Sequence, residues 1–166
     1  MTEIQSLEQN IADLREQLTG LWDALATASE DDEIRLKQKI RKRKKKLAEF
    51  DREYWQLVSQ VAPTWSVDEA DAELIQGEIV EGINRIEELS ASEQQTEMLE
   101  LLKEIRAQLN KPGSTAAGKL KGVISSMPPF IELQYHAELD TEKFFKTYFP
   151  TFRSAITRIA RLNAKK

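Results

Sequence analysis

Cysteine is absent from this 166-residue sequence, and histidine occurs once, as His136. The lack of cysteine excludes disulfide bonds, thiolate zinc sites and cysteine nucleophiles. One histidine and scattered carboxylates do not assemble into a credible Ser/His/Asp set or a cluster of imidazole metal ligands. We therefore expect a protein that is not an enzyme and that binds no metal and no other cofactor.

Long apolar runs are also missing, since none approaches the roughly 20 residues that a membrane-spanning helix needs. The first residues, Met1 to Ile4, lack the basic and apolar regions of a secretory signal peptide. We expect a soluble protein of the cytoplasm without a membrane span. A chain of this length has room for one domain, or for a hairpin and a small second module.

Apolar residues recur in the first 60 residues at alternating steps of three and four, the spacing of a coiled-coil seam. Folding the second half of this pattern back on the first pairs Leu14 with Leu47 and Leu7 with Tyr54. The pattern predicts an antiparallel helical hairpin over residues 3–61, with its turn within residues 29–32. The seam consists of Ile4, Leu7, Ile11, Leu14, Leu18, Leu21, Leu25 and Ala28, then Leu36, Ile40, Arg43, Leu47, Phe50, Tyr54 and Leu57.

A second pair of helices is predicted for residues 66–110. Ser66 to Glu69 has the form of a capping box, and apolar residues then recur with helical spacing. Gly77 and Gly82 interrupt the first of these helices, where each glycine costs about 0.5–1 kcal/mol relative to alanine. Glycines at such positions indicate that a neighbouring element packs close to the helix.

The net charge of −4 conceals a segregation of sign along the chain. Residues 1–61 hold 11 basic and 12 acidic groups, residues 62–110 hold 3 and 12, and residues 111–166 hold 10 and 4, which gives −1, −9 and +6. An acidic middle and a basic end indicate that the two parts dock on each other, or that each meets a different partner.

The twelve residues from 35 to 46 contain nine basic residues and no acidic one. On the predicted hairpin Arg43 occupies a seam position, whereas Arg41 and the six lysines surround the second helix outside the seam. The facing helix offers no acid along this stretch. The candidate anion-binding residues are Arg35, Lys37, Lys39, Arg41, Lys42, Arg43, Lys44, Lys45 and Lys46.

This basic run predicts a surface for phosphate-rich partners, either nucleic acid or anionic lipid headgroups. A solvated helix face and a docking surface for the acidic residues 66–109 are the alternatives. Aromatic residues interleaved with the basic ones, which are typical of nucleic-acid binding, are missing from the run. Trp22 flanks the seam, with Lys37 as its expected neighbour, and is a candidate protein-interaction residue or an ordinary packing residue of the hairpin.

Residues 111–118 have the composition of a flexible linker. Gly113, Gly118 and Lys119 match most of a phosphate-binding loop, but Leu120 stands where serine or threonine would hold magnesium. We expect a helix before this loop and a strand after it, the reverse of the order that presents backbone amides to phosphate. The sequence therefore argues against nucleotide binding.

Residues 119–166 predict a strand–strand–helix module. Residues 130–139 alternate apolar and polar side chains as a half-buried strand does, and residues 120–127 form a weaker partner strand. A last helix follows, with a kink or break near Phe149 because Pro150 lies inside it. So small a module needs its strand edge covered, and the flexible linker favours a contact between chains. The candidate protein-interaction residues are Phe144, Phe145, Phe149 and Phe152.

Three stretches within residues 119–152, namely 121–133, 138–145 and 149–152, resemble C-terminal segments of TRADD-N-like and effector-associated adaptor modules. Such modules accompany large NTPases in bacterial signalling and conflict systems. The N-terminal hairpin is also similar to helical hairpins in such proteins. The resemblance implies an interaction module that recruits partners or oligomerises, with no catalytic residues.

The sequence thus predicts an α+β, mainly α protein. Its parts are a coiled-coil hairpin at residues 1–61, an acidic helix pair at 66–110, a linker at 111–118 and the strand–strand–helix module at 119–166. We expect a non-enzymatic adaptor or oligomerisation protein whose partner is another protein or a second copy of the chain. The alternative function is nucleic-acid or anionic-surface binding through residues 35–46.

Overall fold

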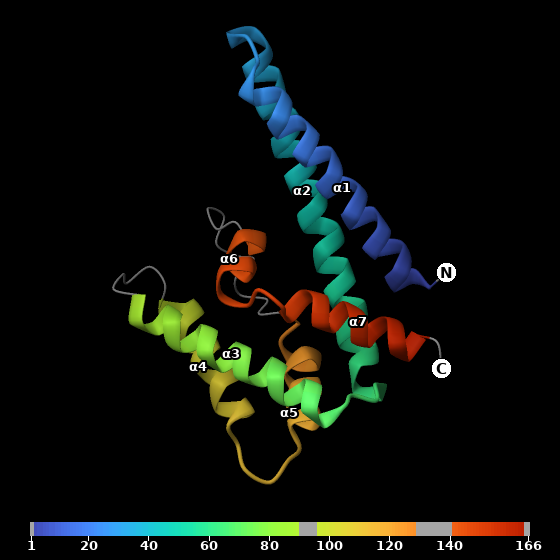
Figure 1. Ribbon diagram of the computed structural model, residues 1–166, viewed down its shortest axis with the longest axis vertical. Coiled ribbons are helices and arrows are strands. Elements are labelled where there is room, and N and C mark those ends of the chain that lie inside the picture. Colours follow the sequence, from blue (N-terminus) through green and yellow to red (C-terminus); the bar gives the residue numbers. More distant parts are fainter. Residues whose placement is uncertain (1, 90–95, 129–140, 165–166) are drawn as a thin grey trace. The chain divides into compact units, whose positions relative to one another are not determined.

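The computed structural model describes residues 2–89, 96–128 and 141–164 (Figure 1). The chain divides into two compact units, residues 1–57 and residues 58–166. The first unit contains α1 (Glu3–Ala26) and most of α2 (Glu30–Val61). The second contains η1 (Ala62–Thr64), α3 (Glu69–Leu89), α4 (Thr96–Leu109), α5 (Ala116–Ser126), α6 (Thr141–Tyr148) and α7 (Phe152–Ala164).

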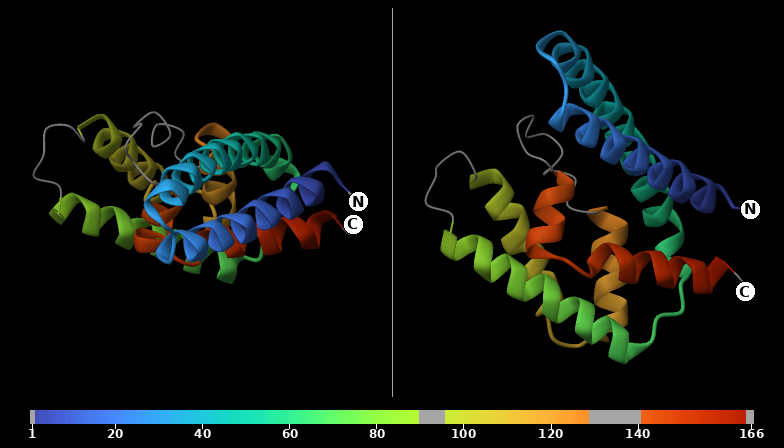
Figure 2. Two further views of the ribbon diagram at one scale, coloured as in Figure 1. Left: turned by 90° about the horizontal axis from the view of Figure 1, so that it is seen from above. Right: turned by 45° about the horizontal axis from the view of Figure 1, so that its top comes forward.

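Helices α1 and α2 run antiparallel as a helical hairpin, as predicted (Figures 1 and 2). A capping box starts α1, because Thr2 Oγ1 accepts the Gln5 N–H at 3.2 Å and Gln5 Oε1 accepts the Thr2 N–H at 3.0 Å. Ser29 caps α2 by accepting the Asp32 N–H at 3.4 Å. The turn therefore occupies residues 27–29, slightly earlier than predicted. Four acidic residues then fill the first turn of α2, where the helix dipole favours negative charge.

The predicted seam is buried in the middle of α1 and in two parts of α2, whereas its outermost members Ile4, Ala28 and Leu57 are half-buried. Its buried members are Leu7, Ile11, Leu14 and Leu18 on α1, with Leu36, Ile40 and Tyr54 on α2. The Tyr54 hydroxyl donates to Glu8 Oε1 at 3.4 Å, beside the predicted pairing of Leu7 with Tyr54. Leu47 and Phe50 are half-buried and Arg43 is exposed, so the least buried stretch of the seam overlaps the end of the basic run.

Helix α3 is the centre of the second unit, since α4, α5, α6 and α7 all pack against it. On its inner face Ile75, Ile79, Ile83 and Ile86 of the predicted apolar stripe are buried together with Ala72, whereas Leu89 at the end of the stripe is exposed. A stripe with steps of three and four covers one side of a helix, which is enough for several neighbours to share.

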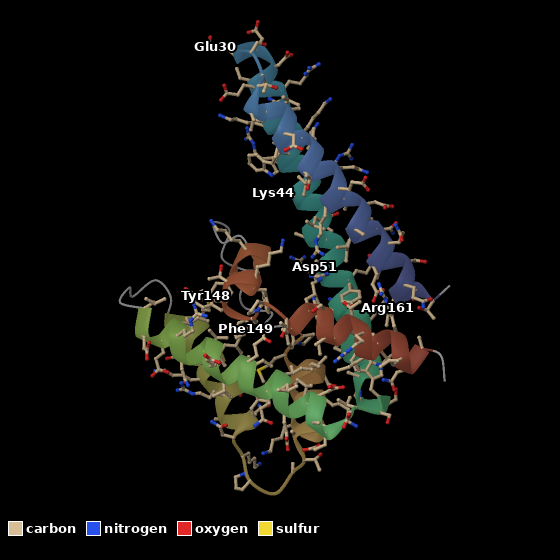
Figure 3. All side chains as sticks on the ribbon, in the orientation of Figure 1. Glu30, Lys44, Asp51, Tyr148, Phe149 and Arg161 are labelled. Atoms are coloured by element: carbon tan, nitrogen blue, oxygen red, sulfur yellow. The ribbon has the colours of Figure 1, made fainter. Side chains whose placement is uncertain are left out.

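Gly82 is the position where α3 allows the closest approach. A Cβ atom there would lie 2.5 Å from the carbonyl oxygen of Tyr148 and 2.5 Å from Cε1 of Phe149. Figure 3 shows Tyr148 and Phe149 beside α3. At Gly77 no described atom of a neighbouring element lies within 4 Å of the corresponding position. The expectation of a close neighbour is therefore confirmed for Gly82 and wrong for Gly77.

The prediction of an α+β fold with a strand–strand–helix module is wrong. Residues 116–126 form helix α5 instead of a strand, and the residues that the structure describes contain helices but no strand. The reason is that Leu120, Val123 and Ile124 recur with helical spacing and are buried in a helix that packs on α3 and α4. The other predicted strand, residues 130–139, lies outside the described residues.

The break expected near Phe149 is present. Helix α6 ends at Tyr148 and α7 begins at Phe152, with Pro150 between them. Thr151 precedes α7, and both its N–H, at 2.7 Å, and its hydroxyl donate to the carboxylate of Glu78 on α3. An acidic side chain of α3 thus fixes the start of α7, where the helix dipole favours negative charge.

The segment between η1 and α3 is held in place by side chains of α5 and α7. Asn163 of α7 accepts the Ser66 N–H at 2.8 Å and donates to the Ser66 carbonyl at 3.1 Å. Lys121 of α5 donates to the carbonyl of Trp65 at 3.1 Å. Within the described ranges, no helix has the length and apolar character needed to cross a lipid bilayer.

Candidate functional site

The basic run lies on an uninterrupted stretch of α2, and all nine of its basic residues are exposed. Only Leu36 and Ile40 within it are buried in the hairpin. Twelve residues of α-helix extend about 18 Å, so the cationic side chains cover most of the circumference of α2 over that length. Figure 3 places Glu30 at the turn of the hairpin and Lys44 midway along α2. We call residues 35–46 the cationic segment.

Three members of the cationic segment form ion pairs with acidic residues of α2 itself. The acids lie just before and just after the segment, at helical spacings of three or four residues. All six side chains are well exposed, so each pair contributes only about 0.3–0.5 kcal/mol. The pairs are Arg35 with Asp32 at 3.0 Å, Lys37 with Glu33 at 2.7 Å and Lys46 with Glu49 at 3.8 Å.

The interior of the cationic segment lacks such partners. In the described part of the hairpin, residues 2–57, no carboxylate lies within 4.0 Å of five of its cations. Neutralisation inside the hairpin is therefore confined to the two ends of the segment. The five cations are Lys39, Arg41, Lys42, Arg43 and Lys45.

Two aromatic rings accompany the cationic segment, although none occurs in its sequence. The Lys44 Nζ atom lies 5.3 Å from the centroid of the Trp22 ring, and Lys46 Nζ lies 5.0 Å from that of Phe50. The contact expected between Trp22 and Lys37 is thus made by Lys44, while Lys37 pairs with Glu33. Lys44 follows Lys37 by one heptad and therefore lies on the same side of α2. This spacing is the feature of the sequence from which the contact could have been predicted.

The phenylalanines predicted as a protein-interaction face lie in the interior of the second unit. Phe149 and Phe152 are each 1% exposed, Phe144 is buried and Phe145 is half-buried. The Phe145 ring centroid lies 5.6 Å from that of Phe149 and 6.2 Å from that of Phe152. Aromatic pairs at these separations are ordinary stabilising contacts of a core.

The sequence that resembles a phosphate-binding loop is followed by helix α5 instead of the expected strand. An anion could bind at such a helix start, but the carboxylate of Glu69 already does so. It accepts the N–H groups of Ala116 at 2.6 Å and Ala117 at 3.1 Å, and Thr115 Oγ1 accepts the Gly118 N–H at 3.0 Å. These amides have acceptors within the chain, which counts against phosphate binding here.

The capping box expected between Ser66 and Glu69 has other partners in the structure. The Glu69 carboxylate accepts from α5, and the Ser66 N–H donates to Asn163. Helix α3 begins at Glu69, and Asp68 accepts the N–H of Ala70 at 3.3 Å. Across the described ranges, no three His, Cys, Asp or Glu side chains are grouped to hold a metal ion.

Comparisons of the chain with protein-family models, with curated proteins and with solved structures found no match. The resemblance to TRADD-N-like and effector-associated modules stays an expectation from the sequence. Any function must therefore be inferred from the geometry of the chain itself.

Proposed function

We propose that the hairpin binds nucleic acid through the phosphate backbone, without reading its sequence, and that the cationic segment is the binding surface. The observation that carries the proposal is the set of five exposed cations with no carboxylate partner among the described residues of the hairpin. Phosphate contacts from lysine and arginine supply most of the free energy of such binding, because they release counterions from the nucleic acid.

The interior of the cationic segment carries a repulsion that no carboxylate in the described part of the hairpin offsets. Like charges three or four residues apart on a helix repel each other, by a few tenths of a kcal/mol for each pair. Lys39 with Arg43 and Arg41 with Lys45 are two such pairs in the interior of the segment. A polyanion lying along α2 would convert this repulsion into attraction. About 18 Å of helix spans about five base pairs of duplex.

A lipid surface fits the geometry of α2 less well. Helices that lie on membranes bury a free apolar face below the headgroups. The apolar positions of α2 within the cationic segment are Leu36 and Ile40, and both are already buried in the hairpin. Nucleic acid needs no apolar face and is the better match to a helix surrounded by charge.

The adaptor function expected from the sequence is our second proposal. Fewer residues now support it, since three of the four phenylalanines assigned to it are buried and the fourth, Phe145, is half-buried. The large apolar side chains that are exposed, such as Ile34 and Leu74, occur singly along the chain, which is ordinary for a protein surface. No geometric observation favours this function over nucleic-acid binding.

The test is the binding of fluorescently labelled duplexes of two unrelated sequences to the full chain, followed by anisotropy over a range of salt concentrations. We expect similar affinities for both sequences and a steep loss of affinity with salt. The triple variant Lys39→Gln, Lys42→Gln, Lys45→Gln should bind at least about tenfold more weakly. Its salt slope should fall by about 0.9 for each phosphate that the variant no longer neutralises.

The matched control replaces three lysines of the second unit, Lys103, Lys111 and Lys119, by glutamine. It changes the net charge of the chain by the same amount and leaves the cationic segment intact. We expect it to bind like the unchanged protein. Equal losses in the two variants, or no binding at near-physiological salt, would contradict the proposed function.

A further inference from the structure

Trp22 differs from the other two tryptophans of the chain in its exposure. Its side chain is 47% exposed, whereas Trp55 and Trp65 are 4% and 5% exposed. It follows the buried seam residue Leu18 by one helical turn and so lies at the border of the seam, with much of its ring in water. About half of the Trp22 surface therefore remains available to a binding partner.

The surroundings of Trp22 connect it to the cationic segment. The Nζ atom that lies 5.3 Å from its ring centroid belongs to Lys44, and Arg41 and Lys37 precede Lys44 by three and seven residues, so they lie on the same side of α2. The exposed ring and the candidate phosphate-binding groups therefore share one surface, although they come from different helices. A lysine above an exposed ring is held weakly and can be displaced by another flat or charged group.

We infer that Trp22 stacks on an unpaired base, and that the hairpin therefore prefers single-stranded to double-stranded nucleic acid. Proteins that bind single strands without sequence preference combine a positively charged track for the backbone with aromatic rings for the bases. Here the cationic segment is the track and Trp22 is the ring. The inference rests on the proposed function and specifies its substrate.

The duplex is disfavoured because its bases are already stacked and paired, so their faces cannot reach Trp22. In a single strand the base can occupy the ring face where Lys44 now lies. The ammonium group of Lys44 is then free to contact a phosphate next to that base. Sequence tolerance follows, since every base has a face that can stack on an indole ring.

The experiment compares an oligothymidine of about 15 nucleotides, close to the upper site size of known single-strand binders, with a duplex of equal length. The unchanged protein should bind the single strand more tightly. Trp22→Ala should weaken single-strand binding by about tenfold, the typical effect of removing one stacking contact. Duplex binding should change by less than about twofold, because phosphate contacts carry it. Trp22→Phe should retain most of the single-strand affinity.

Tryptophan fluorescence gives an independent measurement. Stacking of a base on Trp22 should quench part of the emission when the single strand binds, and this change should vanish in Trp22→Phe, where Trp55 and Trp65 remain. Ile34→Ala, which removes another exposed apolar side chain of the hairpin, is the control and should alter neither affinity nor quenching. Circular dichroism verifies that each variant keeps its helical content.

The outcomes separate the role of Trp22 from the proposed function. Equal affinities for both forms of nucleic acid, with no effect of Trp22→Ala, would overturn the role of Trp22 and leave the proposed function standing. Absence of salt-dependent binding to either form would overturn both. A single-strand preference that survives in Trp22→Ala would also refute the stacking role.

Discussion

Charged side chains serve opposite purposes in the two units of this chain. In the second unit they join helices. Glu69 and Glu78 of α3 accept backbone N–H groups at the starts of α5 and α7. Arg106 of α4 donates to Asn84 and Glu87 of α3 at 2.6 and 2.7 Å. Within residues 2–57 of the hairpin, the interior of the cationic segment makes no such contact with a carboxylate. Charges already engaged in structure cannot also bind a partner, so the hairpin is where a partner should be sought.

The contrast extends to how tightly the helices approach. The second unit depends on a residue without a side chain at Gly82, where α3 meets the backbone at the end of α6. In the hairpin, no described atom of a neighbouring element lies within 4 Å of the position that a Cβ atom would take at Gly20 of α1. At Gly82 the second unit has no space for a larger side chain. The hairpin is held by a repeated seam, and its outer surface is exposed.

The largest effect should come from alanine at these two glycines. Gly82→Ala places a Cβ atom against the carbonyl oxygen of Tyr148 and the ring of Phe149. We expect it to lower the free energy of unfolding by about 1–3 kcal/mol, the usual cost of overpacking. Gly20→Ala should instead raise stability by about 0.5–1 kcal/mol, because alanine is the better helix former. Urea unfolding followed by circular dichroism measures both, and a stabilising Gly82→Ala would refute the close approach.

An intermediate effect is expected when an acid that joins helices is compared with one that does not. Glu69→Ala leaves the N–H groups of Ala116 and Ala117 without their acceptors and should cost about 0.5–2 kcal/mol, as the loss of a helix cap does. Glu16 of α1 is exposed and has no partner among the described residues of the hairpin. Glu16→Ala should change stability by less than about 0.5 kcal/mol. Thermal unfolding distinguishes the two, and equal effects would remove the contrast between the units.

The smallest effect on stability should follow from removing charge from the cationic segment. The variant Lys39→Gln, Lys42→Gln, Lys45→Gln relieves repulsion between neighbouring cations and breaks no ion pair of the hairpin. We expect its unfolding midpoint to stay the same or to rise slightly, by a free energy of less than about 1 kcal/mol. A clear loss of stability in the same urea titration would show that these lysines have structural partners after all.

How far the sequence predicts this fold depends on how local each pattern is. The hairpin follows from a seam repeated over some fifteen positions, so that exceptions such as Arg43 do not obscure it. The segment 116–126 is short, contains Gly118 and Gly122, and has alternating as well as helical apolar spacing. Burial on α3 and α4 decides in favour of the helix, and that information lies outside the segment.

The candidate site was predictable where it depends on a local pattern and not where it depends on how distant residues pack. A run of nine basic residues is visible in the sequence, and helical geometry alone distributes them around α2. The position of Trp22 beside Lys44 depends on how two helices meet and on the reach of a long side chain. The burial of Phe149 depends on Gly82, 67 positions earlier, which no local pattern reveals.

The capping of α5 and α7 by acids of α3 has a consequence for the order of folding. Glu69 reaches Ala116 across 47 positions and Glu78 reaches Thr151 across 73, so each bond closes a long loop. Loop closure is opposed by chain entropy, so such bonds are expected to form after the folding transition state. Glu69→Ala and Glu78→Ala should therefore mainly speed unfolding in stopped-flow measurements and leave the folding rate nearly unchanged. Two carboxylates of one helix would then slow the unfolding of the native state and so lengthen its lifetime.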